Sequence, residues 1–339
     1  MKKILLFIAL MPFISFGQGV SWLKNGNLKT VFDIAQSQNK NVLIEVFSPT
    51  CHVCQSFMPV FEENSVGNAF NSGYVSYKLD INSQEAQAFL SKQNLWIPSL
   101  PMLLYFDKKV NLQHISILGE GQNQAQTLVN SVGVANDSSK RLTSFAARFS
   151  NGNKEPNFLI DFGYMAKIKK DTITSIRVME EYAKGQKGNL DNQTNFLVLQ
   201  KIIFDSENLL YKNMMANLGQ YQKKYTAKAV TQVAENIIMS SLYSSRAINF
   251  SSEKINNLAN DMKKVGIDSK SVENRTLLPE INVYFKANQA NLAIARIEKF
   301  IKLAAPSPKE YEFLGNLVKQ KTSDKAALAK ANEWLKKAK

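Results

Sequence analysis

Cys51 and Cys54 are the only cysteines in this chain of 339 residues, and two residues separate them. Thiols at positions i and i+3 can close a small disulfide ring that is readily made and opened. If Cys51 begins a helix, the unpaired backbone N–H groups and the helix dipole stabilise its thiolate and lower its pKa. Cys54 would then lie one turn deeper. The spacing therefore predicts that Cys51 attacks a disulfide and that Cys54 resolves the mixed disulfide.

Other uses of a Cys-X-X-Cys pair need partners that are scarce in this sequence. A zinc site needs at least two further ligands, and the only histidines are His52 and His114. Covalent haem attachment needs a histidine directly after the second cysteine, where Gln55 stands. We therefore expect no cofactor and no resident metal. An inert structural disulfide and a site for copper or another thiophilic metal remain as alternatives.

The sequence around the pair alternates between strand and helix patterns. Short apolar or alternating runs predict strands at residues 41–47, 74–81, 102–106 and 114–118. Helical spacing of apolar residues predicts helices at residues 28–38, 51–61, 84–92 and 122–132. This order predicts an α/β domain over residues 18–135, with a central mixed sheet and helices on its faces.

The beginning of the chain has the pattern of a secretory signal peptide. Lys2 and Lys3 precede the apolar run 4–14, and small residues stand at the −3 and −1 positions of a cleavage site after Gly17. The run is too short to cross a membrane, which takes roughly 20 apolar residues. We expect the signal peptide, residues 1–17, to be removed. The mature chain should then be a soluble periplasmic or secreted protein without a transmembrane segment.

The pattern changes past Val134. A polar, turn-rich stretch at 136–140 predicts a linker, and residues 141–339 predict one helix after another. Helices of this length with short connections are typical of helical hairpins stacked as repeats, and a non-repetitive bundle is the alternative. The last hairpin weakly resembles a tetratricopeptide repeat at Tyr311, Leu314, Gly315, Ala327 and Ala331.

Charge is divided unevenly between the two predicted domains. Residues 1–140 hold 10 Lys and Arg against 9 Asp and Glu, whereas residues 141–339 hold 32 against 19. Export argues against nucleic acid as the partner of the basic half. The charge is therefore expected to serve an acidic protein or the anionic envelope surface, or else it is simply a solvated surface.

The segment Ile-Glu-Val-Phe-Ser-Pro-Thr-Cys-His-Val-Cys at residues 44–54 resembles the strand, turn and helix of thioredoxins. Within that superfamily it is most similar to the C-terminal periplasmic domain of the thiol:disulfide interchange protein DsbD. Glu45 stands six residues before Cys51, at the position of the family's buried carboxylate. Pro59 stands five residues after Cys54, at the position of the proline that kinks the active-site helix.

A second segment extends this resemblance, which covers about residues 25–135. Residues 99–107 match the part of the family that carries a cis-proline facing the cysteines, so Pro101 is the cis candidate. The resemblance implies that backbone groups at Leu100, just before this proline, bind the substrate chain. It also implies that Glu45 transfers a proton to or from the inner cysteine, for which a raised pKa in a buried site is suited. A solvated Glu45 and a trans Pro101 are the alternatives.

The sequence also departs from the common thioredoxin pattern. Thr50 stands where thioredoxins have Trp, and His52 and Val53 replace Gly-Pro between the cysteines. A protonated His52 would stabilise the Cys51 thiolate. The resemblance to the DsbD domain implies a reductant or electron carrier rather than an oxidant or isomerase.

Together these features predict an exported thiol–disulfide oxidoreductase that exchanges disulfides with protein partners and recruits them through a basic helical domain. Two other functions remain open, because a fold does not fix a function. One is a non-catalytic binding or assembly protein with a thioredoxin scaffold. The other is a thiol metallochaperone.

Overall fold

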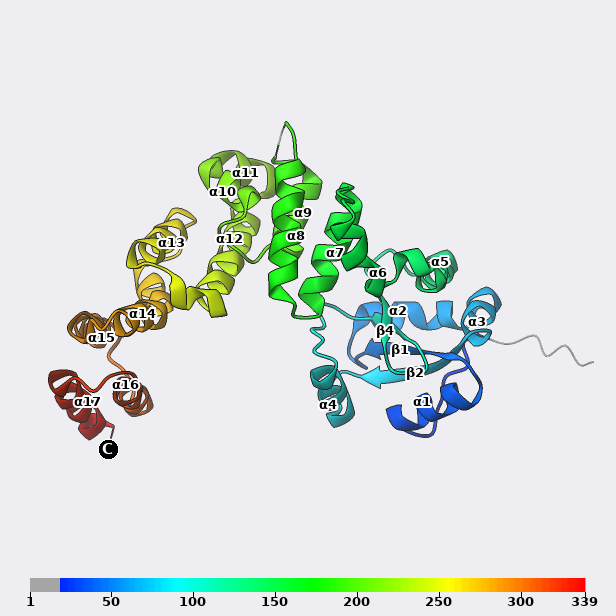
Figure 1. Cartoon of the computed structure of the whole chain (residues 1–339), viewed down its shortest axis with the longest axis horizontal. Helices are drawn as coiled ribbons and strands as arrows, with labels where there is room; N and C mark the ends of the chain where they lie inside the picture. Colours follow the sequence, from blue (N-terminus) through cyan, green and yellow to red (C-terminus); the bar gives the residue numbers. More distant parts are fainter. Residues whose placement is uncertain (1–18, 189, 339) are drawn as a thin grey trace, which may run out of the picture. The chain divides into compact units, whose positions relative to one another are not determined.

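A computed structural model describes residues 19–188 and 190–338 of the chain (Figure 1). The predicted signal peptide and its cleavage site lie outside the described residues. The chain divides into two compact units, the first ending at Thr172 and the second beginning at Ile173. Each unit is described separately below.

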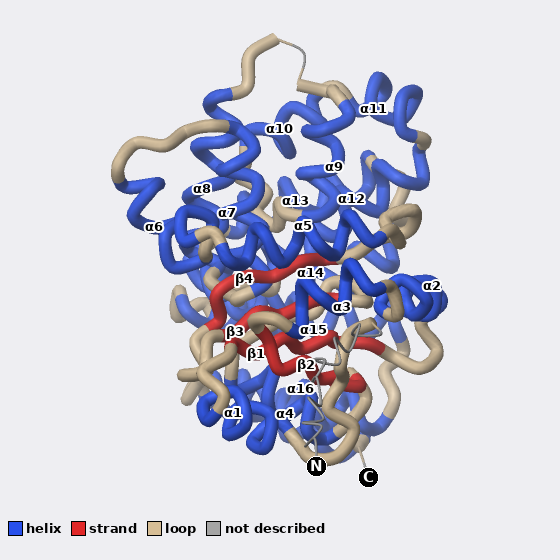
Figure 2. Tube along the Cα trace, turned by 90° about the vertical axis from the view of Figure 1, so that its right-hand side faces the viewer, coloured by secondary structure: helices blue, strands red, loops and turns tan. Residues whose placement is uncertain are grey.

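Four strands form a mixed sheet in the first unit (Figure 2). In the order in which they lie side by side they are β2 (Tyr74–Asp80), β1 (Asn41–Phe47), β3 (Met102–Phe106) and β4 (Leu112–Ile117). β1 runs parallel to β2 and antiparallel to β3, and β4 is antiparallel to β3. The predicted mixed sheet with flanking helices is therefore confirmed.

The alternation of side chains along β1 divides the apolar core into two layers. One face of the sheet packs against α1 (Leu28–Ser37) and α4 (Gln84–Lys92). The other face packs against α2 (His52–Phe61), α3 (Asn64–Asn71) and α5 (Ala125–Asn136). Leu43 is fully buried in this second layer. Glu45, two residues further along β1, therefore points to the same side, toward the helix that follows Cys51.

Two helices beyond the predicted linker also belong to the first unit. They are α6 (Leu142–Ser150) and α7 (Pro156–Ile168). Ile168, at the end of α7, is fully buried in the same core layer as α1 and α4. The polar residues 136–140 end α5 and form a short 3-10 turn, in which Asp137 accepts a hydrogen bond from the backbone N–H of Ser139. The first compact unit thus continues about thirty residues past this turn, to Thr172.

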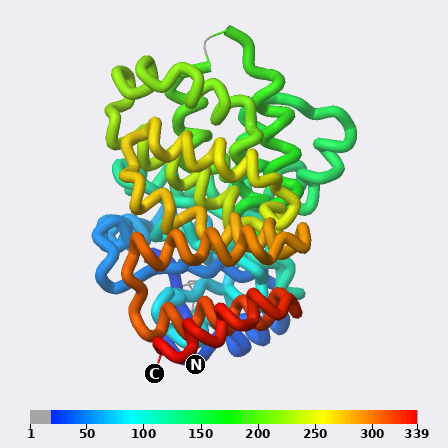
Figure 3. The backbone as a smooth tube through the Cα atoms, turned by 90° about the vertical axis from the view of Figure 1, so that its left-hand side faces the viewer, coloured from blue at the N-terminus to red at the C-terminus, as the bar shows by residue number. Residues whose placement is uncertain are grey.

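The second unit consists of helices among its described residues, which confirms the predicted change to an all-helical architecture. Its helices are α8 (Thr172–Gly185), α9 (Gln193–Lys201), α10 (Leu209–Ala216), α11 (Leu218–Tyr225), α12 (Ala227–Leu242), α13 (Ser252–Lys264), α14 (Ser269–Lys286), α15 (Ala290–Ala304), α16 (Pro308–Lys321) and α17 (Lys325–Lys337), with a 3-10 turn at Ser245–Asn249. The last four helices follow one another as two packed pairs (Figure 3). No helix in the described part of the chain is long and apolar enough to cross a membrane.

Small residues and one buried cation hold the last helices of this unit together. A Cβ atom at Gly315 of α16 would lie 2.6 Å from the Leu335 side chain of α17, so these helices approach too closely for a larger residue. Arg296 of α15 is only 8% exposed and binds α14. Its guanidinium donates to the Glu280 carboxylate and, over 2.8 Å, to the backbone carbonyl of Glu273.

Candidate redox site

Cys51 and Cys54 form a disulfide at the start of α2, with their Cα atoms 5.2 Å apart. Cys51 is the N-cap residue of the helix, and its Sγ accepts a hydrogen bond of 3.0 Å from the backbone N–H of Cys54. Cys51 is half-buried, whereas Cys54 is only 4% exposed. The outer sulfur is therefore the one that a partner can reach, and the helix N-terminus around it favours a thiolate.

A short turn between β1 and α2 fixes the position of Cys51. The backbone N–H of Cys51 donates to the carbonyl of Ser48 over 3.1 Å, and the hydroxyls of Ser48 and Thr50 lie 3.1 Å apart. From the helix side, the Gln55 amide donates to the carbonyl of Pro49 over 2.9 Å. The turn thus places the first cysteine at the end of a buried central strand.

Glu45 lies in the middle of β1 and is only 2% exposed. Burial raises the pKa of its carboxyl above the ordinary value of 4.5, and the ammonium of Lys78 lowers it in part. Lys78 lies opposite Glu45 on β2, with its Nζ 3.4 Å from Oε2 of Glu45. Among the described residues, this oxygen makes no hydrogen bond, so the ion pair is what offsets its burial.

Sequence reasoning missed Lys78 and the aromatic rings that surround it. Its Nζ lies 4.9 Å from the ring centre of Trp22, 5.7 Å from that of Phe61 and 5.8 Å from that of Phe47. The Lys78 side chain is 31% exposed, so it connects the buried Glu45 carboxyl with solvent. The lysine within the predicted strand 74–81 could have indicated a charged partner for Glu45. Nothing in the sequence indicated that Trp22 lies at the site, because its segment pairs with β2 through a single bridge to Ser76.

The peptide bond between Leu100 and Pro101 is cis. Pro101 is buried and Leu100 is half-buried. The next residue, Met102, pairs with Val46, one residue before the end of β1. Pro101 and the cysteine turn therefore lie at the same end of the sheet. Pro59 lies inside α2 and is exposed.

The two histidines occupy different environments. His52 is exposed at the first position of α2, beside the cysteines. His114 pairs with Tyr105, farther along β3 from Pro101, and burial lowers its pKa to about 4. Its Nδ1 is buried and makes no hydrogen bond among the described residues. In the described part of the chain, no group of three or more His, Cys, Asp or Glu side chains could hold a metal ion.

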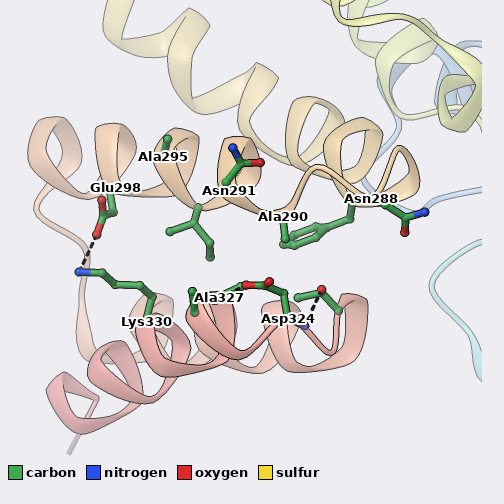
Figure 4. Close-up of a pocket in the computed structure, with 12 residues that line it drawn as sticks. Asn288, Ala290, Asn291, Ala295, Glu298, Asp324, Ala327 and Lys330 are labelled. Atoms are coloured by element: carbon green, nitrogen blue, oxygen red, sulfur yellow. Dashed lines mark hydrogen bonds and ion pairs between the residues drawn. The ribbon is translucent and has the colours of Figure 1, made fainter.

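The second unit contains a pocket of about 680 Å³ between α15 and α17 (Figure 4). Its lining includes the apolar residues Phe285 and Ile294, and an ion pair of 3.2 Å between Glu298 and Lys330 joins the two helices at one end. Asp324 accepts a hydrogen bond from the N–H of Ala327 as the N-cap of α17. The charged groups of this pocket thus engage one another or the backbone.

No protein-family model matches this chain, and no curated protein matches it. The case for a function therefore rests on the geometry at the start of α2. That geometry combines a reachable outer sulfur on Cys51, a buried inner sulfur on Cys54 and a buried carboxyl on the adjoining strand.

Proposed function

We propose that the protein is an exported thiol–disulfide oxidoreductase whose first unit is thioredoxin-like. The observation that carries the proposal is the Cys51–Cys54 disulfide, which has its outer cysteine at a helix N-terminus and its inner cysteine buried. A sulfur that only has to hold the fold together gains nothing from this asymmetry, whereas stepwise disulfide exchange depends on it. The pattern of residues 1–17 supports export to the periplasm or beyond, a compartment where disulfides form and are exchanged.

The proposed direction is reductive. The Cys51 thiolate of the reduced protein attacks one sulfur of a partner disulfide, the partner S–S bond breaks, and one partner thiolate leaves. Cys54 then attacks Cys51, which releases the second partner thiolate and forms the Cys51–Cys54 disulfide. The partner has gained two electrons and two protons. A dithiol donor protein must return both to the cysteine pair before the next cycle.

Glu45 is proposed to move the proton of Cys54. Burial raises the pKa of the Glu45 carboxyl, so it holds a proton more readily than a carboxyl in water, as general acid–base catalysis requires. Lys78 pairs with it and is partly exposed, so it provides the path by which the proton exchanges with solvent. His52 is proposed to stabilise the Cys51 thiolate from the exposed side of the helix start. Leu100 and Pro101 are proposed to bind the backbone of the partner.

The strand order, the cis Leu100–Pro101 bond and Pro59 within α2 are compatible with the thioredoxin superfamily. Within that superfamily, the proposed likeness to the DsbD domain is supported by the sequence of residues 44–54. The close packing at Gly315 and the successive helix pairs are compatible with tetratricopeptide-type repeats. The second unit is proposed to recruit the partner, which its net positive charge would favour if the partner is acidic.

Single-turnover reduction of a small aromatic disulfide tests the proposal. Cys51→Ser should abolish the reaction, whereas Cys54→Ser should perform the first attack and stop at a mixed disulfide that a mass spectrum detects. Ser56→Ala, one turn along the same helix, serves as the matched control and should react as the wild type does. Retention of activity by Cys51→Ser would contradict the proposal.

A second candidate function is binding without catalysis, which the pocket between α15 and α17 favours. The reduction potential of the cysteine pair separates the two functions. A potential far below those of thioredoxins, about −270 mV, would indicate a structural disulfide, whereas a value near or above it supports exchange. Stoichiometric binding of Cu(I) by the reduced protein would instead favour a metallochaperone.

A further inference from the structure

Few large apolar side chains are exposed in the described part of the first unit. They are Met58, Trp96 and Val110. Trp96 is 40% exposed and lies five residues before Pro101, on the segment that leads to the proposed partner-binding proline. An exposed tryptophan offers a large rigid contact area at a low cost in side-chain entropy, which is why this residue is enriched where proteins bind one another.

The C-terminal turn of α7 holds this segment in place. The backbone N–H of Trp96 donates to the carbonyl of Ile168 over 2.8 Å, and the Asn94 amide donates to the carbonyl of Lys169 over 3.1 Å. Ile168 is fully buried, and Leu95 and Leu100 pack in the same core layer. The backbone at Trp96 is therefore held by a helix that lies beyond the predicted α/β domain, residues 18–135.

The surface beside Trp96 is basic. Lys169 and Lys170 are exposed at the end of α7, and neither forms an ion pair among the described residues. The Nζ of Lys167, on the last turn of the helix, lies 5.5 Å from the ring centre of Trp96. Asp171 is the one acidic residue that directly follows these lysines in the sequence. An apolar ring bordered by lysines is complementary to a polypeptide segment that carries apolar and acidic residues.

We infer that Trp96, Lys169 and Lys170 form a docking ledge for disulfide-bearing polypeptides with apolar and acidic residues near the reacting cysteine. The inference rests on the proposed function and adds the class of substrate. The ledge is continuous with the segment of Leu100 and Pro101, so a chain bound there extends past the proline toward α7. It selects among substrates and takes no part in the exchange of bonds.

The experiment measures release of thionitrobenzoate from mixed disulfides by the reduced full-length protein in a single turnover. Attack by Cys51 on the peptide sulfur releases the coloured thiolate, and Cys54 then releases the peptide thiol. Three probes are compared: N-acetylcysteine, a dodecapeptide with a central cysteine flanked on both sides by Leu and Glu, and the same peptide with Lys in place of Glu. The wild type should react with the Glu peptide about tenfold faster than with the Lys peptide at low salt.

Two variants of the ledge should change this preference in different ways. The double variant K169E/K170E should reverse the order of the two peptides. W96A should slow both peptides by roughly fivefold, and W96F should restore much of the loss. Neither variant should change the rate with N-acetylcysteine, which is too small to reach the ledge.

Matched controls lie in the turn between β3 and β4, at the end of β3 away from Pro101. K108E/K109E carries the same change of charge, and V110A removes an apolar side chain of similar exposure, 37%. Both should behave as the wild type. Equal rates for the two peptides with the wild type, or equal losses in V110A and W96A, would overturn the ledge. A wild type that reacts with N-acetylcysteine no faster than Cys51→Ser would instead overturn the proposed oxidoreductase.

Discussion

A buried carboxyl in the first unit and a buried guanidinium in the second differ in the number of their partners. Glu45 in the first unit is 2% exposed and has one ionic partner, Lys78. Arg296 in the second unit is 8% exposed and contacts two carboxylates, a backbone carbonyl and the Thr276 hydroxyl. Glu45 keeps a raised pKa because its single partner compensates its burial only in part.

The difference separates a group suited to proton transfer from one that holds two helices together. The Arg296 guanidinium binds two carboxylates on α14 and so ties α15 to α14. A carboxyl with few partners holds a proton more readily than one in water, which is the property that proton transfer needs. Burial by itself is therefore a poor guide to function, and the number of partners is a better one.

Arg296→Met should have the largest effect on stability. It leaves Glu273 and Glu280 without their shared cation, so the second unit should lose about 3–5 kcal/mol of unfolding free energy. Urea unfolding in a W22F/W96F background, in which Trp334 is the remaining tryptophan and reports on this unit, measures the loss. Lys299→Met is the control, because Lys299 is 56% exposed, also pairs with Glu273 and should contribute less than about 1 kcal/mol. Similar losses in the two variants would mean that Arg296 is not the central cation.

Lowering the pH should destabilise the first unit through His114. The pKa of this histidine is lowered to about 4 in the folded protein from an ordinary value of 6.5, so the unfolded chain binds the proton more tightly. The stabilising contribution is complete above the unfolded pKa and is lost as the pH falls through the interval from about 6.5 to 4. Between pH 7 and pH 5 we expect a loss of roughly 2 kcal/mol.

Urea unfolding followed by fluorescence in a W334F background, in which Trp22 and Trp96 are the remaining tryptophans, reports on this unit. His114→Gln should flatten the dependence on pH between pH 7 and pH 5. An unchanged slope in His114→Gln would show that another group titrates.

Glu45→Gln should have the smallest effect on stability and a clear effect on exchange. Because the folded pKa of Glu45 is raised, its contribution to stability is complete below the unfolded pKa and is lost as the pH rises through the folded value. The variant should therefore be slightly more stable than the wild type at neutral pH and should lose the dependence of the exchange rate on this carboxyl. Glu62→Gln, an exposed neighbour of α2, should change neither property. A less stable Glu45→Gln would mean that the Lys78 pair outweighs the cost of burial.

Local sequence patterns predicted the strands and the position of the cysteines better than they predicted contacts between distant segments. The apolar run 41–47 coincides with β1. A central strand is buried on both faces, so its sequence is apolar at nearly every position and is easily recognised. The helix α3 was missed, since it is short and polar and contains Gly67. A Cβ atom there would lie 2.1 Å from the carbonyl oxygen of Gly19, so a distant contact explains that glycine.

The sequence predicted where the candidate residues lie relative to one another, and only in part what surrounds them. The spacing of Glu45, Cys51 and Pro101 follows from one strand, one turn and one neighbouring strand, all visible in the sequence. Lys78 and Trp22 reach the site across the sheet, and nothing in their own segments shows their partner. The same holds for α7. Its sequence shows an apolar face but not the partner of that face, which the structure identifies through Ile168 in the core layer of α1 and α4.

The short segment that carries Trp22 also has a consequence for handling the protein in solution. It lies along the outer edge of β2, where Trp22 bridges Ser76 and the N–H of Leu23 donates to the Ser76 carbonyl over 2.9 Å. An uncovered outer strand presents free backbone groups that can pair with a second chain. Proteolytic loss of residues 19–23 would therefore expose the edge of β2 and promote aggregation during storage. It would also remove the Trp22 ring that contacts Lys78, the partner of Glu45.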